Sequence, residues 1–162
     1  MNRDELRNEI NKAKEHLANM EKILKGREYE RWEPKEGEGY YFVGPDRKVY
    51  TDINYKNIRN IEAIRAYNCF KTKGEAEQEC EKILVRRQLE DIARRLNKGK
   101  QVMWYTDDTK YYLYINCDGE IDTDYNAYLA VQGTIYCLDK SFKRVAIEEI
   151  GQERLKKYLR GD

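Results

Sequence analysis

The residues of this chain best suited to chemistry are carboxylates at alternating positions in its last third. They are Asp118, Glu120, Asp122 and Asp124, and Asn126 continues the pattern. A calcium loop has a similar run of oxygen ligands, but it needs glycine at its sixth position and glutamate at its twelfth. Here the glycine comes second and Leu129 comes twelfth. Magnesium would accept the same carboxylates, yet no phosphate-binding loop accompanies them. We therefore expect a hairpin with a solvated acidic face, no metal site and no cofactor.

Nucleophilic catalysis lacks its usual partners in this sequence. Ser141 is the only serine and His16 the only histidine, and they lie near opposite ends of the chain, whereas a serine triad needs both in contact. The cysteines are widely spaced and include no C-x-x-C pair; they are Cys69, Cys80, Cys117 and Cys137. A dispersed carboxylate pair needs only spatial proximity and stays open as an alternative. The sequence contains no catalytic motif, and we expect a protein that is not an enzyme.

Composition limits the remaining classes. The 162 residues include 31 basic and 30 acidic side chains, which leaves a net charge of +1. This balance lacks the bulk positive field of a general nucleic-acid-binding protein. No apolar run approaches the ~20 residues that cross a bilayer, and the charged N-terminus does not match a signal peptide. We therefore expect a cytoplasmic protein with reduced, buried cysteines and no membrane partner.

Tyrosine is unusually frequent, with 14 copies. Exposed tyrosines suit interfaces because they offer a large amphipathic area at a low entropic cost. Tyrosine also favours half-buried strands, so a purely structural role is equally open. The tyrosines nearest the acidic run join it as a predicted partner-binding site. The residues of this predicted site are Asp118, Glu120, Asp122, Asp124, Tyr125 and Tyr128.

A long helix is predicted between Thr72 and Asn97. Thr72 and Glu75 form a capping box, apolar residues then recur with a helical period, and Asn97 with Gly99 provides a stop. The opposite face carries a basic stripe of Arg86, Arg87, Arg94 and Arg95, which could bind phosphates or an acidic partner. Acidic residues at 90 and 91 lie four positions from these arginines, which favours a solvated face with intrahelical ion pairs.

An N-terminal helical arm is predicted over residues 1–26. Its apolar residues are spaced by alternating steps of four and three, as in a coiled-coil seam: Leu6, Ile10, Ala13, Leu17, Met20 and Leu24. So narrow a stripe suits one partner helix. That partner would be the same arm of a second chain, giving a homodimer, or the 72–97 helix of the same chain.

Two strand-rich segments flank the central helix. The first has strands at 40–43 and 49–52, an ambiguous stretch at 54–66 that favours a short helix, and a short strand at 67–70. The second has strands at 101–105, 110–117, 120–125 and 128–137, with a type I′ turn at Asp118-Gly119. Helices follow at 140–150, capped by Asp139, and at 152–160, after a break at Gly151.

The predicted fold class is therefore α+β. Two units, each a strand meander followed by a helix, succeed the arm and suggest a degenerate duplication. The predicted domains are 1–26, 27–99 and 100–162, with 27–162 as one domain as the alternative.

Three segments resemble a group of small accessory proteins of phages and prophages in Gram-positive, clostridia-type bacteria. The segments are W-x-P-K-x-G-E-x-Y-Y-F at 32–42, N-C-F-K-T-K-x-E-A-E at 68–77 and A-I-E-x-I-G-x-E-R-L at 146–155. In this group a glycine usually stands where this chain has Tyr67. The group has no assigned activity, so the resemblance implies only a context, in which small proteins without enzymatic motifs often bind and inhibit a host protein.

The leading functional hypothesis is accordingly a phage-encoded inhibitor of a host defence system. Its most concrete version is an anti-CRISPR protein that covers a nucleic-acid-binding or catalytic surface of a Cas effector or its RNA complex. The alternatives are a nucleic-acid or nucleotide-binding module that uses the basic stripe, an oligomeric structural or assembly protein, and a small enzyme with a dispersed carboxylate site.

Overall fold

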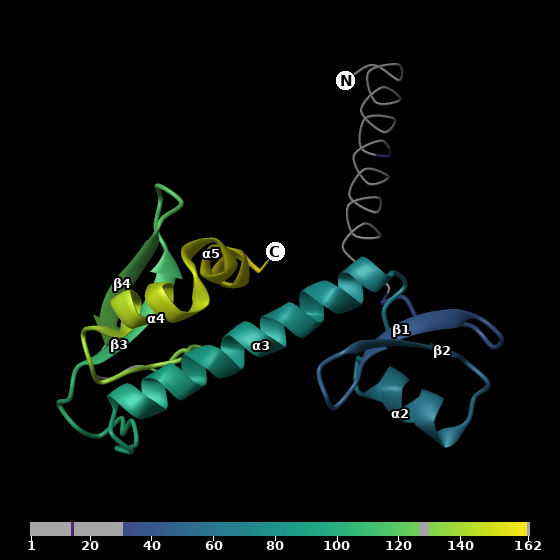
Figure 1. Ribbon diagram of the computed structural model, residues 1–162, viewed down its shortest axis with the longest axis horizontal. Helices are drawn as coiled ribbons and strands as arrows, with labels where there is room; N and C mark the ends of the chain where they lie inside the picture. Colours follow the sequence, from purple (N-terminus) through teal and green to yellow (C-terminus); the bar gives the residue numbers. More distant parts are fainter. Residues whose placement is uncertain (1–13, 15–30, 127–129, 162) are drawn as a thin grey trace, which may run out of the picture. The chain divides into compact units, whose positions relative to one another are not determined.

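The computed structural model describes residue 14 and residues 31–126 and 130–161. The chain divides into two compact units, Met1–Glu33 and Pro34–Asp162. The second unit contains, in chain order, β1 (Gly39–Val43), β2 (Val49–Ile53), α2 (Ile58–Arg65), α3 (Lys73–Leu96), β3 (Lys110–Ile115), β4 (Ile121–Asn126), α4 (Phe142–Ile150) and α5 (Gln152–Arg160) (Figure 1). This confirms the predicted α+β class. The predicted N-terminal seam and the boundary after residue 26 lie outside the described residues.

The strands form two separate antiparallel hairpins, β1–β2 and β3–β4. α3 contacts β1 and β2 and also α4 and α5, and Figure 1 shows it as the long helix that joins the two groups of elements. No helix in the described ranges is long and apolar enough to cross a membrane.

α3 begins and ends where its sequence predicts. The Glu75 N–H donates to the Thr72 hydroxyl at 3.3 Å, and the Thr72 N–H donates to the Glu75 carboxylate at 3.0 Å. At the other end Asn97 is the C-cap and Gly99 has a φ of +77°. The capping box and the stop are therefore confirmed.

The main core lies between the C-terminal half of α3, the inner face of β3–β4 and the last two helices. Its buried residues are Val85, Leu89, Ile92, Ala93, Leu113, Ile121, Cys137, Phe142, Ala146, Ile150 and Leu155. A second buried group belongs to the first hairpin, the segment before α3 and the N-terminal half of α3, and comprises Tyr40, Val43, Cys69, Ala76 and Cys80. The prediction of buried cysteines is confirmed for three residues and wrong for Cys117, which is exposed in the β3–β4 turn.

The β1–β2 hairpin has a short loop that ends in a left-handed residue. The Arg47 N–H donates to the Gly44 carbonyl at 2.9 Å, the Gly44 N–H donates to the Lys48 carbonyl at 2.8 Å, and Arg47 has a φ of +61°. A turn followed by one left-handed residue is the usual geometry of a three-residue hairpin loop.

The β3–β4 hairpin uses the same loop geometry. The Gly119 N–H donates to the Asn116 carbonyl at 3.0 Å, the Asn116 N–H donates to the Glu120 carbonyl at 2.9 Å, and Gly119 has a φ of +78°. The predicted two-residue type I′ turn is therefore wrong. Strand pairing ends with Ile115 opposite Ile121, whereas a two-residue loop at Asp118-Gly119 would place Ile115 opposite Asp122.

α2 is anchored by polar rather than apolar contacts. Asn60, its one buried residue, donates from Nδ2 to the Tyr40 hydroxyl and to Asp52 Oδ2, both at 3.0 Å, and accepts the Tyr55 N–H at 2.9 Å. By contrast, Ile58 is 77% exposed. The helix predicted within 54–66 is thus confirmed, although its isoleucine spacing does not mark its buried side.

Three predicted strands do not form in the described residues. Residues 101–105 are a loop with a turn, and the described part of 128–137 pairs only through an isolated bridge between Cys137 and Tyr111. The strand predicted at 67–70 likewise reduces to a bridge between Phe70 and Tyr41. The 101–109 loop instead packs over Lys110, which is fully buried and donates to the Thr106 carbonyl at 2.7 Å.

The helix after Asp139 starts later than predicted. α4 begins at Phe142 with Ser141 as its N-cap residue, and no side chain caps it. The Asp139 carboxylate accepts the Ser141 N–H at 2.8 Å, so it stabilises the preceding turn. Gly151, with a φ of +91°, separates α4 from α5 as predicted.

In both halves a hairpin is followed by a single bridge and then by a helix, α3 after Phe70 and α4 after Cys137. In the first half, however, α2 lies between the hairpin and the bridge, and no helix stands at the equivalent place in the described residues 130–136. The two bridges also join different positions of their strands. Tyr41, the partner of Phe70, lies two residues before the end of β1, whereas Tyr111, the partner of Cys137, lies four residues before the end of β3. The duplication stays a prediction.

Candidate functional site

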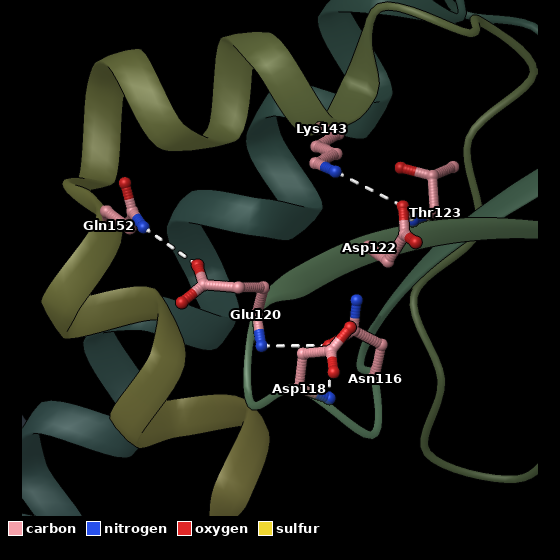
Figure 2. A network of polar contacts seen from close by, with 7 residues as sticks. All are labelled: Asn116, Asp118, Glu120, Asp122, Thr123, Lys143 and Gln152. Carbon is pink, nitrogen blue, oxygen red and sulfur yellow. Dashed lines mark hydrogen bonds and ion pairs between the residues drawn. The ribbon is translucent and has the colours of Figure 1, made fainter.

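The turn of the β3–β4 hairpin is held by one side chain. Asn116 Oδ1 accepts the N–H groups of Asp118 and Glu120, at 3.1 and 2.9 Å, as Figure 2 shows. This places the exposed Asp118 at the tip of the hairpin. Within the described residues Asp118 forms no ion pair.

Glu120 connects the hairpin to α5. Its carboxylate accepts from Lys156 Nζ at 2.7 Å and from Gln152 Nε2 at 3.2 Å (Figure 2). The hydrogen bond from Lys156 lowers the pKa of the Glu120 carboxyl below its ordinary value. Glu120 therefore contributes to packing within the chain as well as to the surface charge.

Asp122 makes the corresponding connection to α4. Its Oδ1 accepts the Thr123 N–H at 2.8 Å and the Lys143 ammonium at 3.1 Å (Figure 2). The bond from the Thr123 N–H and then the bond from Lys143 lower the pKa of the Asp122 carboxyl. Two of the four predicted carboxylates are thus shared with lysines of the same chain.

Asp124 interacts within the hairpin itself. Its Oδ2 accepts the Tyr112 hydroxyl at 3.1 Å, and its Oδ1 accepts the Tyr125 N–H at 2.7 Å. Burial, and then this hydrogen bond to Asp124, raises the pKa of the Tyr112 hydroxyl. No lysine or arginine within the described part of the chain forms an ion pair with Asp124, so its negative charge is available to a partner.

Strand register brings these carboxylates beside tyrosines that the sequence analysis did not include in the site. Tyr112 lies directly opposite Asp124, and Tyr114 lies opposite Asp122. Side chains at alternate positions share one face of a strand pair, and those of opposed residues are neighbours. We call Tyr112, Tyr114, Asp122 and Asp124 the carboxylate–tyrosine face. The signal in the sequence was the two-residue spacing of the tyrosines, read together with the hairpin register.

Aromatic contacts fix the tyrosine side of this face. The Tyr112 ring lies 6.2 Å from that of Tyr114 and 5.6 Å from that of Tyr136, which in turn meets Trp104 edge-on at 4.8 Å between ring centroids. Tyr114 is 37% exposed. The face therefore combines a preorganised aromatic surface with accessible carboxylates.

The predicted tyrosines lie elsewhere. Tyr125 is 68% exposed, but it is opposite Tyr111, and strand alternation places it on the other face from Asp122 and Asp124. Tyr128 is outside the described residues. The structure thus brings Asp122 and Asp124 together on one face, with Asp118 and Glu120 in the adjoining turn.

Ion pairs cover much of the basic stripe. Arg86 pairs with Glu90 at 3.0 Å, whereas Arg94 and Arg95 both pair with Asp91, at 3.7 and 3.0 Å. These are the intrahelical pairs expected of a solvated face.

The remaining interactions of the stripe also favour a structural role. Arg95 reaches Glu149 of α4 at 2.5 Å, so it joins two helices. Arg87 lines a hollow of about 330 Å³ beside the first hairpin, with Tyr67 and Phe70. Three of the four arginines already have carboxylate partners, which weakens the case for a phosphate-binding stripe.

Metal and thiol chemistry find little support in the residues described. Among them, no group of three or more histidine, cysteine, aspartate or glutamate side chains could hold a metal ion. Burial raises the pKa values of the Cys80 and Cys137 thiols, which keeps both in the less reactive protonated form.

No protein family, curated protein or solved structure matches this chain.

Proposed function

We propose that this protein is a phage-encoded inhibitor of a host defence system, and most concretely an anti-CRISPR protein that binds a Cas effector. The observation that carries the binding part of this proposal is the carboxylate–tyrosine face, on which Tyr112 and Tyr114 oppose Asp124 and Asp122. The phage context comes from the sequence resemblance alone. The protein acts in the cytoplasm of the bacterial host.

The mechanism is competition for a basic groove. Nucleic-acid-binding grooves carry positive charge to match phosphates, and a surface with complementary charge accelerates and orients association. Asp118 and Asp124 supply charge that no lysine or arginine of the described chain neutralises through an ion pair. Tyr114 supplies amphipathic contact area of the kind enriched at interfaces.

The ion pairs of Glu120 and Asp122 have a supporting role in this mechanism. Through Lys156 and Lys143 they hold the hairpin against α5 and α4. A hairpin held in this way loses less conformational freedom on binding, and preorganisation of this kind improves affinity.

An affinity pull-down tests the proposal. The tagged protein is incubated with lysate of a clostridial host, with and without nuclease, beside the variants Asp124→Lys and Glu62→Lys. Glu62 is an exposed carboxylate on α2, so its reversal is the matched control. We expect the wild type and Glu62→Lys to recover a defence effector from the lysate even after nuclease treatment. Asp124→Lys should not recover this effector.

Other outcomes would redirect the proposal. Enrichment that disappears with nuclease would favour the nucleic-acid-binding alternative. Equal recovery by Asp124→Lys would show that the carboxylate–tyrosine face is not the contact surface.

A further inference from the structure

The two edges of the first hairpin differ in how their backbone groups are satisfied. On the outer edge of β1, Tyr41 exchanges hydrogen bonds with the Phe70 backbone, at 2.9 Å in both directions. Further along, the Asn68 side-chain amide accepts from the Val43 N–H and donates to its carbonyl, both at 2.8 Å. The β1 edge is therefore closed by its own chain.

The outer edge of β4 is covered by its own aspartates. Asp122 Oδ1 accepts the Thr123 N–H at 2.8 Å, and Asp124 Oδ1 accepts the Tyr125 N–H at 2.7 Å. These bonds occupy donors that another strand would need. Natural sheets often protect their edges with charged side chains in this way.

The outer edge of β2 remains open at Val49 and Thr51. The Gly44 N–H donates to the Lys48 carbonyl and the Asn54 N–H donates to the Glu38 carbonyl, so Lys48 and Asn54 direct their backbone groups towards β1. Because such residues alternate along an antiparallel strand, the backbone groups of Val49, Thr51 and Ile53 point away from β1. Asp52 Oδ1 accepts the Ile53 N–H at 2.8 Å.

Val49 and Thr51 have no such cover. Their outward N–H and carbonyl groups bond to nothing in the described chain. Thr51 is exposed, and Ile53 is 40% exposed. The partner that complements these free backbone groups is another extended strand, which can add to the edge of the sheet.

We propose that the β2 edges of two copies of this chain pair antiparallel about Thr51 and so form one continuous four-stranded sheet. In this register Thr51 faces Thr51, Val49 faces Ile53, and Tyr50 faces Asp52 of the second copy. Threonine pairs and pairs of β-branched apolar residues are favourable across strands, and no like charges are opposed.

Symmetry and backbone chemistry support the same register. The Thr51 groups bond reciprocally across a two-fold axis, which gives a closed dimer. The Val49 N–H donates to the Ile53 carbonyl of the second copy without displacing Asp52. Pairing about Val49 would instead set Ile53 opposite Pro45, which has no N–H to donate.

Site-directed cross-linking tests this pairing on the full chain. All variants carry Cys117→Ser, because Cys117 is the exposed native thiol, and are oxidised with glutathione disulfide. Thr51→Cys should give a disulfide-linked dimer, since directly opposed residues have Cα atoms about 5.5 Å apart. Tyr55→Cys, also exposed, is the matched control, because this register separates its two copies by about 27 Å.

A second pair of variants tests the register. Val49→Cys and Ile53→Cys should each cross-link poorly alone but should form a heterodimer when mixed. A monomeric Thr51→Cys, or equal cross-linking of Thr51→Cys and Tyr55→Cys, would overturn the proposal. Cross-linking of Thr51→Cys to a host protein but not to itself would assign the edge to a foreign strand and would equally refute self-pairing.

Discussion

Arg47 and Gly119 occupy the same position in two hairpin loops of the same geometry. Each of the two residues follows an aspartate, and the N–H of each donates to the carbonyl of the residue three positions earlier. Both have a left-handed backbone conformation, with φ values of +61° for Arg47 and +78° for Gly119. Glycine adopts this conformation without steric cost, whereas other L-residues are disfavoured there by roughly 1–2 kcal/mol. The first hairpin therefore stores strain that the second avoids.

Replacing Arg47 with glycine should stabilise the protein. We expect the free energy of unfolding to rise by about 0.5–1 kcal/mol, because relief of the left-handed backbone exceeds the added freedom of the unfolded chain. Urea unfolding followed by circular dichroism measures the change. Lys48→Gly, one residue later and without a positive φ, is the control and should not stabilise.

The opposite substitution, Gly119→Ala, should destabilise by roughly 1–2 kcal/mol. A Cβ at Gly119 would also lie 3.1 Å from the Arg160 guanidinium, which donates to the Gly119 carbonyl at 2.9 Å. If Arg47→Gly and Gly119→Ala change stability in the same direction, the shared loop geometry is wrong.

Asn60 should contribute strongly to the stability of the first hairpin. Asn60→Leu removes the donor to the Tyr40 hydroxyl, in a residue that is 1% exposed, and also the bonds to Asp52 and to the Tyr55 N–H; the loss of partners for buried polar groups costs about 1–3 kcal/mol. The helix N-cap variant Asn57→Ala, which removes the bond to the Asn60 N–H, should cost only about 1 kcal/mol.

A double-mutant cycle checks the cause of this loss. Combining Asn60→Leu with Tyr40→Phe removes both partners and should recover part of the stability. Strict additivity of the two changes, measured by urea unfolding, would argue against the hydrogen bond as the source.

The Glu120–Lys156 pair should make stability depend on pH in the acid range. The folded pKa of Glu120 lies below its ordinary value of 4.5. The contribution is therefore fully present above that value and is lost as pH falls through the lower folded pKa. Lys156→Met keeps most of the side-chain stem and removes the charge, so the variant should be less stable at neutral pH and should lose less on acidification.

Urea midpoints at neutral pH and at about pH 3 test this prediction. Lys157→Met is the matched control, because Lys157 is an exposed neighbour on the same helix. Parallel pH profiles of the wild-type protein and the Lys156→Met variant would show that this ion pair does not cause the pH dependence of stability.

Local signals explain which parts of the fold could be predicted from the sequence. The capping box at Thr72 and the glycine break at 151 act within a few residues, and both are confirmed. Tyr67 has a φ of +60°, a backbone conformation that glycine adopts without steric cost, and nothing in the tyrosine itself predicts it.

Long-range packing explains what could not be predicted. Residues 101–105 have strand-like composition, but Lys110 is buried under this loop, with its ammonium 5.5 Å from the Trp104 ring centroid. Nothing in the sequence spacing indicates a buried lysine. The acidic run was found, but its pairing with Lys143 and Lys156 depends on helices that lie more than twenty residues further along the chain.

The efficiency of phage plating on an immune clostridial strain tests the central claim most directly. The strain expresses wild-type protein, a Tyr114→Ala/Asp124→Lys variant, or the control Glu62→Lys, and a strain without the targeting spacer gives the plating maximum. We predict that the wild type and Glu62→Lys restore plating to near that maximum, whereas the double variant restores little at equal expression. Full immunity in cells that express the wild type, or full restoration by the double variant, would contradict inhibition of this defence through the carboxylate–tyrosine face.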